Sequence, residues 1–94
     1  LEDNDPTDAL IALEESKKVK PDLPRTHYLL SLTYYKKNEP ALAIESAEEA
    51  IRLDPHYSEA KNTLGRLYMD NNRAQDAEKI LRESAADLKF RGAY

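Results

Sequence analysis

The feature that most constrains the fold of this chain is a period of 34 residues. Residues of the same class return at that spacing along the sequence, without an insertion or a deletion. The matching positions are Ala9, Ala43 and Ala77, Glu15, Glu49 and Glu83, Leu30 and Leu64, Tyr34 and Tyr68, Asn38 and Asn72, and Pro21 and Pro55. A period of this length predicts stacked copies of one supersecondary unit, because a single unit is too small to bury its own apolar face.

Within each period, apolar residues recur at the spacing of an α-helix, and proline or asparagine marks the boundaries. The pattern predicts an all-α fold of five helices, at about residues 6–19, 24–37, 40–53, 57–71 and 73–89. Asp5 is placed to cap the first helix, and Asn38 suits the left-handed backbone that ends the second. Lys89 stands where the period has Pro21 and Pro55, so we expect the last helix to run on.

The composition limits the classes of function. The 94 residues read as one small domain over 1–94, with a formal net charge of −4 and no cysteine. A negative charge without a basic stripe argues against nucleic acid as the partner. No apolar run is long enough to predict a membrane-spanning segment. The lack of cysteine fits reducing and oxidising compartments equally well, so both the cytoplasm and the periplasm stay open.

The periodic residues resemble the tetratricopeptide repeat (TPR) family. The resemblance is carried by Leu64, Gly65 and Tyr68 on one helix, and by Ala43, Ala47, Ala50 and Pro55 on the other helix of the unit. It implies a right-handed α-solenoid of antiparallel helix pairs that binds proteins. It divides the chain into the second helix of a partial repeat, one full repeat and a second full repeat, over 6–23, 24–57 and 58–91. His27 and Lys61 depart from the family, which often has tryptophan there.

The same pattern predicts which residues form the core. Small residues such as Ser31 and Gly65 allow two helices to approach closely, and larger apolar residues fill the layer between neighbouring units. The residues expected to be buried are Leu30, Tyr34, Ala43, Ala47, Leu64, Tyr68, Ala77 and Leu81.

The sequence offers no constellation that predicts catalysis. His27 takes a packing position and is expected to be a half-buried structural histidine, whereas His56 is expected to be solvated in a turn. Neighbouring carboxylates such as Glu48 and Glu49 fall on exposed faces, where they cannot act as a general acid and base. We therefore expect no catalytic residue, no cofactor and no metal site. A small hydrolase or transferase is the less favoured alternative.

Two stripes of side chains point to a binding surface. Residues four and seven apart share a helix face, and the family resemblance implies that this face lines a concave groove. The residues expected to bind a partner peptide or helix are Tyr28, Leu32, Tyr35, Asn62, Arg66 and Met69. The alternative is that Tyr35 and Leu32 only pack against neighbouring helices.

Two further expectations concern the ends of the chain. Residues 85–94 show a fainter resemblance to TPR lipoproteins of type IV pilus biogenesis and stability, which would imply a periplasmic factor in secretin assembly. The outermost helices leave apolar residues uncovered, which predicts either further repeats in a longer protein or self-association through these ends. The residues concerned are Ala9, Leu10, Leu13, Leu81, Ala85 and Leu88.

Overall fold

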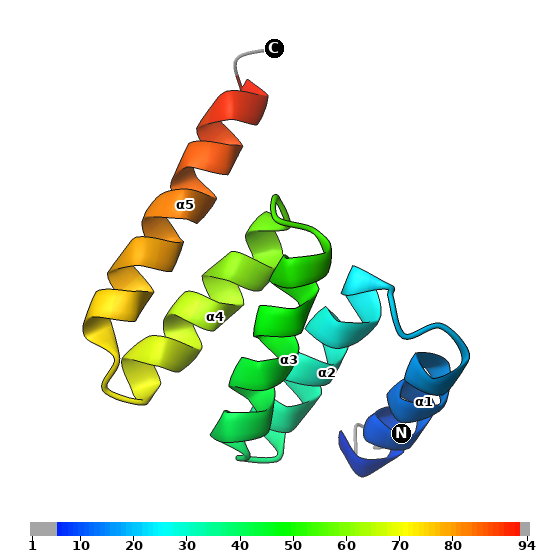
Figure 1. Cartoon of the computed structure of the whole chain (residues 1–94). Helices are drawn as coiled ribbons and strands as arrows, with labels where there is room; N and C mark the ends of the chain where they lie inside the picture. Colours follow the sequence, from blue (N-terminus) through cyan, green and yellow to red (C-terminus); the bar gives the residue numbers. More distant parts are fainter. Residues whose placement is uncertain (1–5, 93–94) are drawn as a thin grey trace.

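The computed structural model describes the backbone of residues 6–92 and the side chains of residues 6–87. Five α-helices follow one another across the molecule in chain order, and the C-terminal part of α5 extends beyond the others (Figure 1). They are α1 (Pro6–Val19), α2 (Pro24–Lys36), α3 (Pro40–Leu53), α4 (Ser58–Asp70) and α5 (Ala74–Gly92). The described residues contain no strand, and the fold is the expected all-α solenoid.

The helix boundaries follow the 34-residue period. α2 and α4 begin 34 residues apart, at Pro24 and Ser58, and α3 and α5 begin at Pro40 and Ala74. The bounds predicted for α1 and α3 are confirmed, whereas α2 ends one residue early and α4 is one residue shorter at each end than predicted. α5 begins one residue late and does run on, to Gly92. Asp5, the predicted cap of α1, lies outside the described residues.

Asparagine ends both α2 and α4 in the same way. Asn38 and Asn72 have φ angles of 64° and 62°, the left-handed region that asparagine tolerates better than most residues. After α2, the amide of Glu39 donates to the carbonyl oxygen of Tyr34 at 2.9 Å, and after α4 the amide of Arg73 donates to that of Tyr68 at 2.8 Å. This C-terminal cap turns the chain sharply into the next helix.

Alanines let the central helix α3 approach its neighbours closely. Ala43, Ala47 and Ala50 are fully buried on α3. Ala43 and Ala47 share a core cluster with Leu64 and Leu67 of α4. On the other side, the Ser31 hydroxyl of α2 donates to the Ala43 carbonyl oxygen at 2.9 Å, a bond that a bulkier interface would prevent. Seven of the eight predicted core residues are buried or half-buried.

Leu81 is the exception, because 39% of its side chain is exposed. The prediction of burial came from its equivalence with Ala47, which lies on a helix that has neighbours on both sides. Among the described helices, α5 packs mainly against α4. On that one side the contact is tight, because a Cβ atom added to Gly65 would lie 2.5 Å from Cδ2 and 2.6 Å from Cγ of Leu81.

A tyrosine–glutamate hydrogen bond recurs between successive helix pairs. The Tyr34 hydroxyl of α2 donates to Oε2 of Glu14 on α1 at 2.7 Å, and 34 residues later the Tyr68 hydroxyl of α4 donates to Oε2 of Glu48 on α3 at 2.6 Å. Burial, and next the bond to glutamate, raise the pKa of both Tyr34 and Tyr68 to about 12. The period therefore repeats a specific polar contact as well as the apolar core.

The contact between Gly65 and Leu81 predicts an energetic coupling. Gly65→Ala gains about 1 kcal/mol of helix propensity, but the added methyl group overpacks against Leu81 at a cost of about 1–3 kcal/mol. In a Leu81→Ala background the clash is absent, so the same change should stabilise the fold. Urea unfolding of the four proteins should give a coupling free energy of about 1 kcal/mol or more between the two sites. Equal effects of Gly65→Ala in both backgrounds would contradict the close packing.

The raised pKa values predict how stability depends on pH. An unfolded tyrosine titrates near pH 10, so the folded state holds the Tyr34 and Tyr68 protons more tightly than the unfolded state does. Their contribution to stability is fully present below about pH 10 and is lost as pH rises towards 12. The urea midpoint of the natural chain should fall over this range more than that of Tyr34→Phe/Tyr68→Phe. Tyr35→Phe, at an exposed tyrosine, is the control, and identical slopes in all three proteins would refute the assignment.

Candidate functional site

Two adjoining cavities lie between α2 and α4. One has a volume of about 160 Å³ and the other about 420 Å³, and Tyr35 and Leu67 line both. We call the two cavities together the α2–α4 groove. The smaller cavity is lined by Leu32, Tyr35, Asn62, Thr63, Arg66 and Leu67. The larger is lined by Tyr35, Asn38, Pro40, Leu67, Asp70 and Asn71.

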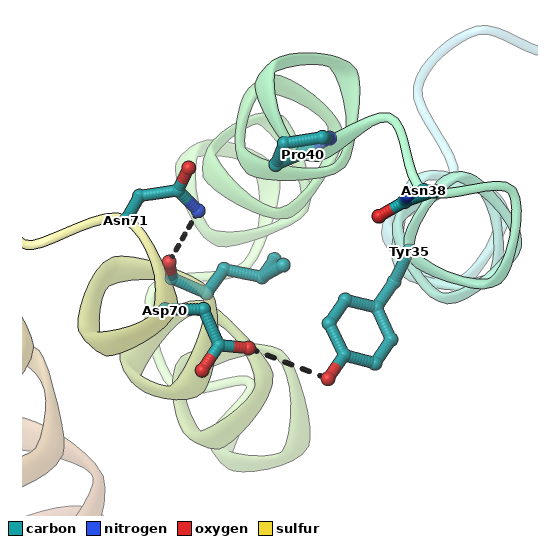
Figure 2. A pocket seen from close by; sticks show the side chains of 6 residues that line it. Tyr35, Asn38, Pro40, Asp70 and Asn71 are labelled. Carbon is teal, nitrogen blue, oxygen red and sulfur yellow. Dashed lines mark hydrogen bonds between the residues drawn. The ribbon is translucent and has the colours of Figure 1, made fainter.

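The packing of α3 explains why these residues meet. Because α3 contacts both α2 and α4 through small side chains, the two helices lie close enough for side chains to bridge them. The Tyr35 hydroxyl donates to Oδ2 of Asp70 at 3.3 Å, and this bond spans the groove (Figure 2). Leu67 forms an apolar floor and is 1% exposed. The groove thus combines an apolar base with polar groups at its edges.

Four of the six predicted binding residues line the groove, namely Leu32, Tyr35, Asn62 and Arg66. Tyr28 lines neither cavity, because its ring packs at a tilt of 47° against the ring of Tyr57, with 5.2 Å between the centroids. Met69 is 56% exposed and also lies outside both cavities.

The groove residues outside the predicted six are Asn38, Pro40, Thr63, Leu67, Asp70 and Asn71. Leu67 follows Leu64 at helical spacing and therefore reads as core. Asn38 and Asn71 read as helix ends, and the side-chain amide of Asn71 does donate to the Leu67 carbonyl oxygen at 2.7 Å. Their positions in the 34-residue period could have indicated them. Asn38 follows the end of α2 and Asn71 follows the end of α4, and the ends of these two helices lie side by side at the larger cavity.

The groove carries charges of both signs, and α4 supplies both. Arg66 lines the smaller cavity and Asp70 the larger, one helical turn apart. The two side chains form no ion pair with each other in the described part of the chain. Each charge is therefore available to a bound partner, and the groove can orient a segment that has an opposite pattern of charge.

The remaining polar clusters have structural roles. Lys61 is 4% exposed, and its Nζ donates to Oδ2 of Asp87 at 2.6 Å, while Nδ1 of His56 lies 3.1 Å from Oδ1 of the same carboxylate. The bonds to Lys61 and then to His56 hold the pKa of Asp87 below its usual value. This cluster joins α4 to α5. His56 is thus exposed, as predicted, but it is also bonded.

His27 is the structural histidine that was predicted, although it is more deeply buried than expected. It is 7% exposed, and its Nε2 donates to the Pro21 carbonyl oxygen at 2.7 Å. Residues 6–87, whose side chains are described, contain no group of three or more acidic or histidine residues placed to hold a metal ion. None of the described helices is long and apolar enough to span a bilayer.

Comparison with known proteins finds one matching family model and a set of similar solved structures. A model of the tetratricopeptide repeat family matches residues 34–93. The crystal structure of MamA superposes with a TM-score of 0.92 at 22% sequence identity, over 97% of this chain and 53% of the MamA chain. The chain therefore spans about half the length of that structure, and at this identity the likeness shows the fold alone. No curated protein matches the sequence, and neither match supports the fainter resemblance to pilus lipoproteins.

Proposed function

Because this chain belongs to the tetratricopeptide repeat family, we propose that it is a non-catalytic protein–protein interaction module that binds a partner peptide or helix in the α2–α4 groove. The observation that carries the proposal is the groove itself. Leu32, Tyr35 and Leu67 provide apolar and aromatic surface, and Arg66 and Asp70 lie at its edge. Protein interfaces characteristically place aromatic and arginine anchors beside apolar pockets.

All six residues of the predicted surface belong to this proposal, in two roles. Leu32, Tyr35, Asn62 and Arg66 would contact the segment seated in the groove. Met69 is exposed on α4, and Tyr28 shares a face of α2 with Leu32 and Tyr35. Both would contact a partner that extends beyond the groove. The proposed boundaries of the partial and full repeats are those given by the period, over 6–23, 24–57 and 58–91.

Binding without chemistry is favoured by the roles of the polar groups around the groove. The Tyr35 hydroxyl is bonded to Asp70, and the Asn71 amide is bonded to backbone. Both bonds fix the shape of the groove. A role in secretin assembly in the periplasm is the more specific alternative. It stays a prediction, because most of the segment on which it rests, residues 88–94, has no described side chains.

Self-association through the ends of the solenoid is the other prediction that we retain. On α1, 58% of Ile11 and 80% of Val19 are exposed, and α1 has no buried residue. On α5, the exposed part of Leu81 lies one residue from Arg82, whose Nη2 pairs with Oε2 of Glu78 at 2.8 Å. Over residues 6–87, whose side chains are described, the large apolar residues exposed on α1 are therefore more exposed than Leu81 on α5. Sedimentation as one monomeric species at every concentration would contradict this inference.

A double variant tests the groove directly. Leu32→Ala/Arg66→Ala removes an apolar and a charged contact without touching a fully buried residue, so the fold should be retained. Truncation of interface anchors often costs 2 kcal/mol or more in binding, and we expect the affinity for the natural partner to fall by about thirtyfold or more. Affinity is measured by calorimetry after the partner has been isolated with the natural chain.

The matched control is Ile11→Ala/Arg82→Ala, which makes the same chemical change at exposed positions on α1 and α5. It should bind as the natural chain does. If the groove variant keeps its helical spectrum and its affinity, the partner does not bind in the groove. Loss of binding in the control alone would assign the interface to the solenoid ends.

A further inference from the structure

We infer that the larger cavity of the α2–α4 groove receives a lysine or arginine side chain of the partner, a specificity that rests on the proposed function. The cavity of about 420 Å³ lies where the C-terminal ends of α2 and α4 meet. Its six lining residues include one charge, the carboxylate of Asp70, and no cation. The cavity therefore presents a negative charge to whatever enters it.

Hydrogen-bond acceptors surround the open space. Figure 2 shows the Asp70 carboxylate and the Tyr35 hydroxyl facing each other across the cavity, with the side-chain oxygen of Asn38 turned towards the same space. The bond from Tyr35 to Asp70 is 3.3 Å long and exposed, so one carboxylate oxygen keeps most of its capacity to accept. An ammonium or guanidinium group brings only donors, which matches a site rich in acceptors.

The helix ends strengthen the preference for a cation. The C-terminus of a helix carries a partial negative charge, and both α2 and α4 end at this cavity. α2 ends at Lys36 and α4 ends at Asp70, and the left-handed asparagines that follow turn the chain away. The two dipoles and the carboxylate add in the same direction. Lys36, in the last turn of α2, is not among the residues that line the cavity, so an anionic side chain inside it would face the Asp70 carboxylate and two helix C-termini.

The walls suit the aliphatic part of a long basic side chain. Leu67 and Pro40 are apolar lining residues, and the ring of Tyr35 forms one side of the cavity (Figure 2). A cation near an aromatic face gains further attraction, and the methylene groups of lysine or arginine pack on apolar surface while the charged end reaches Asp70. Arg66, one turn earlier, would pair with an acidic residue or a carbonyl oxygen nearby in the same segment.

The test is a selection of random linear peptides displayed on phage against the full chain. We expect the peptides that bind in the groove to carry a lysine or arginine. In synthetic peptides, replacement of that arginine by citrulline, or of lysine by norleucine, should weaken binding about three- to tenfold, as measured by fluorescence anisotropy. Asp70→Asn should cause the same loss and remove the difference between arginine and citrulline peptides. The substitution keeps an acceptor for the Tyr35 hydroxyl, so the fold should not change.

Glu15→Gln is the matched control, because it removes one negative charge at an exposed position on α1, outside the groove. It should leave the arginine preference intact. Two results would overturn this inference and leave the proposed function standing. In both, the selected peptides lose affinity for the Leu32→Ala/Arg66→Ala variant. In the first they carry no basic residue, and in the second they bind Asp70→Asn as tightly as the natural chain. Peptides that depend on Asp70 but not on Leu32 and Arg66 would support the basic pocket and contradict the wider groove. A selection without any binder would count against both.

Discussion

The close approach of α3 to α2 and α4 is the contact on which the rest of the structure depends. Three alanines of α3, at positions 43, 47 and 50, are fully buried and leave no side chain to hold the neighbouring helices apart. Burial of so little side chain contributes modestly to the hydrophobic free energy. Its larger effect is geometric, because it brings Tyr35 of α2 within hydrogen-bonding distance of Asp70 on α4 and so forms the groove.

The two helix pairs reach similar packing with different side chains. In the second pair Gly65 on α4 faces Leu81 on α5, and the equivalent positions of the first pair hold Ser31 on α2 and Ala47 on α3. A larger residue on one helix is thus matched by a smaller one on the other. Conservation of total volume, and not of each residue, is what close packing requires. The two tyrosine–glutamate hydrogen bonds add a specific polar contact to this packing. One joins α2 to α1, and the other joins α4 to α3.

The repeated spacing made most of the fold predictable from sequence. Apolar periodicity and the residues at helix ends depend on local chemistry, so all five helices and the left-handed Asn38 could be placed within a residue or a few. For Leu81 the sequence supported two expectations, burial by equivalence with Ala47 and exposure at an uncovered end, and its 39% exposure agrees with the second, because burial depends on which helices lie alongside. The groove was predicted in part for the same reason. Leu32 and Arg66 follow from helical spacing, whereas the packing of Tyr28 on Tyr57 joins a helix to a turn outside the regular pattern.

The measurement that most directly tests the central claim is hydrogen exchange of the chain with and without its natural partner, followed by mass spectrometry. The account predicts that binding slows exchange in α2, α4 and the turn that contains Asn38, where the groove residues lie. Exchange in α5, and in α3 beyond Pro40, should change little, because no other residue of these two helices is among those that line the groove. Protection confined to α3 and α5, or to the exposed side of α1, would show that the partner binds elsewhere on the solenoid and would contradict the account.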